Sequence, residues 1–155
     1  MSMEGMYFMY SAFSLLHILG AVAMGFYAIV PFIVGKLNKL STAGQEGLLV
    51  GVGTANRLGQ YFLIVQFITG GYLMSQAKYS VLWMVLTTVV FLAIAAFSGI
   101  MGKQIKLAAQ SAKSGKADAA ATGKVRTFST LIFVLFIVIV LLMVYSYKFI
   151  TVTAG

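Results

Sequence analysis

The chain has 155 residues, of which 61% are hydrophobic and 9% are charged, and its formal net charge is +8. Soluble domains carry about 25% charged residues, so this composition excludes an ordinary soluble enzyme and is typical of an integral membrane protein. The absence of cysteine excludes disulfides, thiolate ligands and iron–sulfur clusters. Membrane topology accounts for the positive charge, so we expect no nucleic-acid partner.

The first predicted membrane span covers residues 7–34. Residues 6–34 contain no Asp, Glu, Lys or Arg, and about 20 apolar residues are enough to cross a bilayer. Pro31 is expected to kink the last turn or two of this helix. The N-terminus has no basic segment and no small-residue cleavage site of the kind found in secretory signals. We therefore expect the first helix to remain in the mature protein.

Three further apolar runs predict spans over residues 58–74, 81–101 and 128–147. The glycine-rich residues 35–57 are expected to form an interfacial connector that leads into the second span. The loop 102–127 is rich in Ala, Lys and Ser. Its first part contains good helix formers that extend the third helix, and its Ser-Gly-Lys-Ala-Asp portion predicts a solvated turn. The sequence thus predicts a single-domain, all-α, up-down four-helix bundle.

The distribution of basic residues predicts the orientation of this bundle. If both termini are extracytoplasmic, every Lys and Arg except Lys78 and Lys148 falls in the cytoplasmic loops 35–57 and 102–127. Tyrosines and Trp83 gather at the opposite ends of the helices, as expected for an aromatic belt. The basic loops are also suited to binding anionic lipid headgroups.

His17 is the only histidine in the chain and the main candidate functional residue. At about 1.5 Å of rise per residue it lies roughly 15 Å into a hydrocarbon layer of about 30 Å. An ionisable group at that depth must find a partner inside the protein. One interpretation is structural, in which a neutral imidazole hydrogen-bonds Gln66, Thr69 or a serine of a facing helix. The others are a haem or copper ligand, a proton relay and a hydrogen-bonding partner of a quinone.

Methionines supply the other candidate ligands. Met24 shares a helix face with His17, and thioethers ligate haem iron and copper. However, seven residues span about 10 Å along a helix, so the two side chains cannot ligate one ion without a further ligand from elsewhere. A second copper hypothesis rests on three methionines spaced three residues apart near the outer surface: Met3, Met6 and Met9.

No catalytic set is visible in the sequence. The three carboxylates, Glu4, Glu46 and Asp118, all lie outside the predicted spans, which disfavours a proton-coupled transporter. The single histidine lies far in depth from any of them, so no nucleophile–base pair is expected. We therefore favour a non-catalytic role.

Short motifs in three of the predicted helices resemble a bacterial family. They are Leu16-His17-Ile18-Leu19-Gly20 in the first, Arg57 just ahead of the second, Ile68-Thr69-Gly70-Gly71-Tyr72-Leu73 within it, and Ser98-Gly99 in the third, before a Lys/Ala-rich loop. The chain is similar to the small four-helix membrane proteins related to the membrane domain of copper-resistance protein D. This resemblance implies a bundle in the bacterial inner membrane with a first-helix histidine placed to meet a metal or haem. Family members often carry a tryptophan after the histidine motif, and the larger ones carry further histidines. This chain has Met24 and no second histidine.

Three hypotheses for function follow. The first is a non-catalytic protein of the copper-resistance type that binds copper or haem through His17 with help from methionines. The second is an accessory subunit of a larger membrane complex, with no cofactor. The third is a quinone-binding redox module that uses His17 and Gln66, together with Thr69, as hydrogen-bonding groups. A homodimer is compatible with the first, because one histidine per chain makes a two-histidine site only by symmetry.

Overall fold

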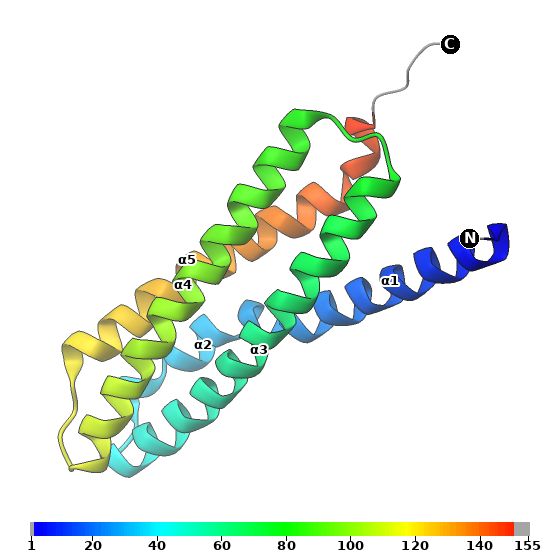
Figure 1. Cartoon of the computed structure of the whole chain (residues 1–155). Coiled ribbons are helices and arrows are strands. Elements are labelled where there is room, and N and C mark those ends of the chain that lie inside the picture. The colour runs from blue at the N-terminus through cyan, green and yellow to red at the C-terminus, as the bar shows by residue number, and fades with distance from the viewer. Residues whose placement is uncertain (1, 151–155) are drawn as a thin grey trace.

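The computed structural model describes residues 2–150, which form four long helical segments (Figure 1). Each segment is long and apolar enough to cross a membrane: Met3–Val34, Thr42–Gln76, Val81–Lys113 and Ala119–Val144. The only β pairing among residues 2–150 is an isolated bridge between Tyr79 and Ile150. The predictions of an all-α chain and of four helices able to span a membrane are therefore confirmed.

The first segment is interrupted rather than simply kinked. Helix α1 (Met3–Met24) is followed by a tighter turn of helix, η1 (Gly25–Ala28), and by the short helix α2 (Val30–Val34). Pro31 lies at the start of α2, and its ring would clash with the carbonyl four residues earlier, at Tyr27, if the α-helix continued. The α-helix α1 therefore ends at Met24, before the proline. The sequence predicts a kink only in the last turn or two before Val34.

Helix α3 (Thr42–Gln76) begins within the stretch that the sequence predicts as a connector. The short turn η2 (Leu37–Lys39) precedes it, and the Ser41 hydroxyl caps its first turn by accepting from the amide of Gly44. Residues 42–57 are thus helical, and the predicted span 58–74 is the second half of a 35-residue helix. The buried positions of α3 recur every three or four residues from end to end: Gln45, Leu49, Val52, Asn56, Gly59, Leu63, Gln66 and Thr69.

Helix α4 (Val81–Lys113) extends well past the predicted span 81–101, as its helix-forming residues indicate. The predicted turn is present at residues 114–118, where Gly115 has a positive φ of 76°. Helix α5 (Ala119–Val144) then begins nine residues before the predicted fourth span, because Asp118 caps it by accepting from the amide of Ala121 at 2.8 Å. A last turn of helix, η3 (Ser146–Phe149), follows α5.

The long helices pack side by side in chain order, with α1 on α3, α3 on α4 and α4 on α5. The C-terminal part of the first segment consists of η1 and α2. It packs on α5 and so closes the bundle. The N-terminal half of α1 leans away from α4 and α5 at one end of the bundle (Figure 1). The α3–α4 connection lies at that end, and the α4–α5 turn lies at the other.

Candidate functional site

The His17 side chain is half-buried at the interface between α1 and α3. Its Nδ1 lies 2.9 Å from the hydroxyl oxygen of Thr69. The imidazole packs over Gly70, where an added Cβ would come 3.2 Å from the ring carbon Cε1. Thr69 is one of the partners that the structural interpretation of His17 expects. The contact also shows that α3 holds the ring in a defined orientation.

Gln66 belongs to the same interface but bonds the backbone of α1 rather than the imidazole. Its Nε2 donates to the carbonyl of His17 at 2.7 Å. Gly20 makes room for this amide, since a Cβ at Gly20 would lie 2.8 Å from Gln66 Nε2. The structure therefore places His17, Gln66 and Thr69 together, with the Gln66 amide group joining two helices.

The direction of the His17–Thr69 hydrogen bond follows from a second contact of the Thr69 hydroxyl. Thr69 Oγ1 donates to the carbonyl of Val65 at 2.8 Å, the usual bond of a threonine within a helix. A hydroxyl has one hydrogen, so its oxygen is then left to accept from an N–H of the imidazole. We therefore assign the proton of the neutral ring to Nδ1 and the lone pair to Nε2.

The other ring nitrogen of His17, Nε2, differs from Nδ1 in having no partner on α3. It makes no hydrogen bond within residues 2–150, and it is not among the atoms sealed inside the bundle. A ligating histidine commonly donates its other ring N–H to a protein oxygen, which orients the ring and raises the basicity of the ligating nitrogen. The Thr69 contact gives His17 this arrangement, with Nε2 available to an external group.

The candidate methionines do not converge on His17. Met24 is 4% exposed and belongs to the hydrophobic core, while Met3 and Met6 are exposed and Met9 is half-buried. Eight residues separate Met9 from His17, which is about 12 Å along α1. Among residues 2–150 there is no group of three or more His, Cys, Asp or Glu side chains that could hold a metal ion. Of the candidate ligands in one chain, only the imidazole Nε2 would therefore bind a metal ion at His17.

A second buried polar cluster, which sequence reasoning missed, joins η1, α3 and α4. The Tyr27 hydroxyl donates to Asn56 Oδ1 at 3.2 Å, and Asn56 Nδ2 donates to the carbonyl of Ser98 at 3.0 Å. All three residues are at most 2% exposed. One signal was present in the sequence: Tyr27 lies far from the outer helix ends where most of the tyrosines gather. This cluster is closed, so it stabilises the bundle and offers no open atom to a ligand.

No protein-family model, curated protein or solved structure matches the chain. We therefore infer function from the geometry and chemistry of the site.

Proposed function

We propose that the chain is a small, non-catalytic, multi-pass membrane protein that binds a haem or copper centre through Nε2 of His17. The observation that supports this function is that Nε2 makes no hydrogen bond within residues 2–150 while Thr69 contacts Nδ1. At the depth of His17 a bilayer contains no water, and a polar atom without a partner there is costly. A metal ion bound to Nε2 satisfies this atom, while Thr69 holds Nδ1.

Haem is the better fit of the two centres. Its iron is already held by four porphyrin nitrogens and needs only axial ligands, such as one histidine, from the protein. Copper needs several ligands from side chains, and His17 is far from Met9 and from the buried Met24. Copper binding at His17 therefore requires ligands from a second chain, for which a homodimer is the simplest source.

The positions of the three carboxylates relative to His17 support a non-catalytic role. Glu4 is exposed in the first turn of α1, and Asp118 caps α5 at the opposite end of the bundle. Glu46 lies near the start of α3, about 30 Å along that helix from Gln66. None of them is near His17 to act with it as an acid–base pair. The site is therefore suited to binding.

The second candidate function is an accessory subunit of a larger membrane complex. It is favoured by the N-terminal half of α1, which leans away from α4 and α5 (Figure 1). Met3, Tyr7 and Phe8 are exposed there. In this function a hydrogen-bond donor of a partner helix, rather than a metal, occupies Nε2 of His17. A quinone would use the same nitrogen, but Gln66, expected to act beside His17, already donates to a backbone carbonyl.

We place the protein in the bacterial inner membrane with both termini outside the cytoplasm. The positive-inside rule supports this orientation, since the basic residues gather around the η2 and α4–α5 connections. The bacterial assignment rests on the resemblance to the proteins related to copper-resistance protein D.

The test is an ultraviolet–visible spectrum with elemental analysis of the protein purified in a mild detergent. We expect the wild type to show a Soret band with near-stoichiometric iron, and the His17→Ala variant to lose both, because the axial ligand is gone. Copper in place of iron, lost in the same variant, would select the copper centre. Met24→Leu is the matched control and should keep the cofactor, since Met24 is a core residue.

A colourless, metal-free wild type that resembles His17→Ala would reject the cofactor function. The accessory function would then predict a stoichiometric partner protein that co-purifies with the wild type. Size-exclusion chromatography of each variant establishes that it is folded before its spectrum is compared.

A further inference from the structure

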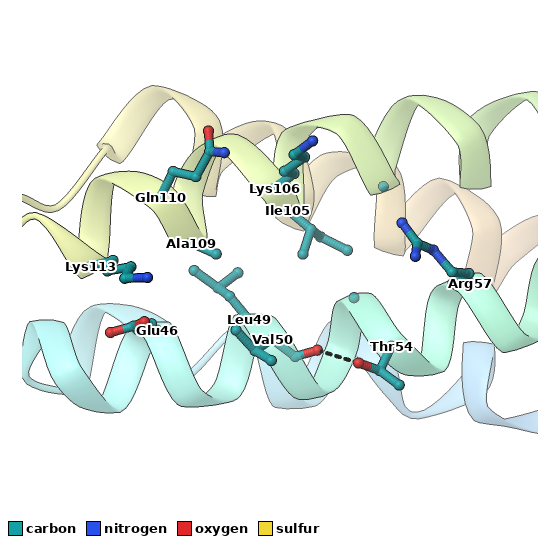
Figure 2. Close-up of a pocket in the computed structure, with 12 residues that line it drawn as sticks. Glu46, Leu49, Val50, Thr54, Arg57, Ile105, Lys106, Ala109, Gln110 and Lys113 are labelled. Carbon is teal, nitrogen blue, oxygen red and sulfur yellow. Dashed lines mark hydrogen bonds between the residues drawn. The ribbon is translucent and has the colours of Figure 1, made fainter.

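A groove of about 500 Å³ runs between α3 and α4 at the end of the bundle near the α4–α5 turn. Figure 2 shows its floor and rim, with Leu49 and Ile105 between the two helices and charged side chains around them. All of its lining residues come from these two helices. The groove is separate from His17 and from its contacts.

Two glycines allow α3 and α4 to pack closely against each other at the floor of the groove. A Cβ at Gly53 would lie 3.1 Å from the Cγ2 methyl of Ile105, and a Cβ at Gly102 would lie 3.0 Å from Asn56 Nδ2. The helices therefore approach closely at these points, and no side chain from either glycine fills the space above. The hollow is part of the packing of α3 on α4.

The rim of the groove is positively charged. Arg57 from α3 and Lys106 and Lys113 from α4 line it, against the single carboxylate of Glu46. None of these four side chains makes an ion pair or hydrogen bond within residues 2–150. Glu46 and Lys113 lie toward one end of the groove and Arg57 toward the other (Figure 2). An anionic group of an external molecule would therefore meet unpaired cations here.

A second, apolar hollow of about 320 Å³ continues along the same pair of helices toward the α3–α4 connection. Phe67 and Phe91 stack across it with ring centroids 6.0 Å apart. The ten residues from Arg57 to Phe67 correspond to about 15 Å of helix, which is half of a hydrocarbon layer of about 30 Å. The stretch from Arg57 to Phe67 therefore matches the length of an acyl chain in one lipid leaflet.

We propose that the α3–α4 groove binds one anionic phospholipid. Its phosphate lies beside Arg57 and Lys106, and an acyl chain lies along the apolar hollow beside Phe67. Charge complementarity selects an anionic headgroup, and the apolar continuation selects a lipid over a small soluble anion. This inference is independent of the proposed cofactor, because none of the groove residues contacts His17.

The experiment is a thermal-unfolding titration of the protein in mild non-ionic detergent with phosphatidylglycerol, phosphatidylcholine or inorganic phosphate. A bound lipid raises the unfolding midpoint of the wild type, and the stabilisation increases with the logarithm of the ratio of lipid concentration to dissociation constant. We expect phosphatidylglycerol to raise it more than the other two additives. Each basic residue near a membrane surface contributes about fivefold to binding, so the Arg57→Gln/Lys106→Gln double variant should bind phosphatidylglycerol roughly 25-fold more weakly.

The matched control is the Lys103→Gln/Lys116→Gln double variant, which removes the same charge from exposed residues outside the groove. It should bind phosphatidylglycerol nearly as well as the wild type. For the apolar part, Phe67→Ala should weaken binding, whereas Phe8→Ala on the exposed face of α1 should not.

Three outcomes would overturn the proposal. Equal weakening in both double variants would indicate diffuse attraction to the basic loops rather than a site. Stabilisation by phosphate as strong as that by phosphatidylglycerol would indicate a soluble anion. Equal stabilisation by phosphatidylcholine would show that the rim does not recognise anionic charge.

Discussion

His17 lies between α1 and α3. Its Nδ1 is held by the Thr69 hydroxyl, and its Nε2 has no hydrogen-bond partner within residues 2–150. The Thr69 hydroxyl donates within its own helix and accepts from Nδ1, so it orients the ring as well as holding it. The Gln66 amide binds the backbone carbonyl of the same residue and secures α1 at this depth. The chemistry available to the site is therefore set by a threonine that does not itself contact the proposed cofactor.

Thr69→Val tests this assignment, since it keeps the side-chain shape and removes the acceptor of the Nδ1 proton. Histidine-selective ¹⁵N nuclear magnetic resonance of the wild type, prepared without cofactor, should show the Nδ1–H tautomer. The single histidine makes the signal unambiguous. In Thr69→Val the tautomer preference should be lost, and the free energy of unfolding should fall by about 0.6 to 1.7 kcal/mol.

The control for this variant is Thr54→Val, an exposed threonine of α3 that makes only the bond within its own helix. It should leave the histidine spectrum unchanged. An Nε2–H tautomer in the wild type would contradict our assignment, because Thr69 would then donate to the ring and Nε2 would hold no lone pair.

At the scale of helices, α3 is the element that lies between α1 and α4. It packs against α1 on one side and α4 on the other, through buried positions that recur along its whole length. Three of its glycines permit close approach, and Gly59 is the most restricted. A Cβ there would lie 2.6 Å from Phe26 Cε1 and 2.9 Å from the Tyr27 hydroxyl oxygen.

Gly59→Ala should therefore destabilise the bundle, by about 1–3 kcal/mol as is typical of overpacked interiors. Gly71→Ala on the same helix is the matched comparison, because nothing lies within 4 Å of its added Cβ. That change should be neutral or slightly stabilising, since alanine favours helix over glycine by up to about 1 kcal/mol. Thermal unfolding in detergent measures both, and equal effects of the two changes would contradict the close packing at Gly59.

For the whole molecule, the proposed orientation predicts which connections face the cytoplasm. The chain has no cysteine, so single-cysteine variants can be labelled without background. With a membrane-impermeant maleimide, Ser75→Cys near the end of α3 should be labelled in intact cells. Ser114→Cys after α4 should be labelled only after the membrane is permeabilised. The reverse pattern would invert the topology, and with it the leaflet from which the α3–α4 groove draws its lipid.

Composition and the lengths of the apolar runs were sufficient to predict the all-α class, four helices able to span a membrane and the extension of the third helix into its basic loop. One interpretation of His17 is a hydrogen bond to Gln66, Thr69 or a serine, and Thr69 is the residue that its ring contacts. These features depend on local properties: apolar length, helix propensity and the scarcity of other polar partners in the bundle.

Other features required the packed structure. The sequence predicts a connector over residues 42–57 because this stretch is rich in glycine. Its polar residues Gln45 and Asn56 nevertheless lie at buried positions of α3, as does Gly59 just after it. Their burial depends on what the neighbouring helices bring: Ser98 for Asn56, and the Phe26 and Tyr27 rings for Gly59. The open Nε2 of His17 and the α3–α4 groove likewise arise from the approach of distant segments. The hydropathy of the sequence indicates which residues can be buried. Only the packing of the helices determines which neighbour contacts or hydrogen-bonds each buried residue.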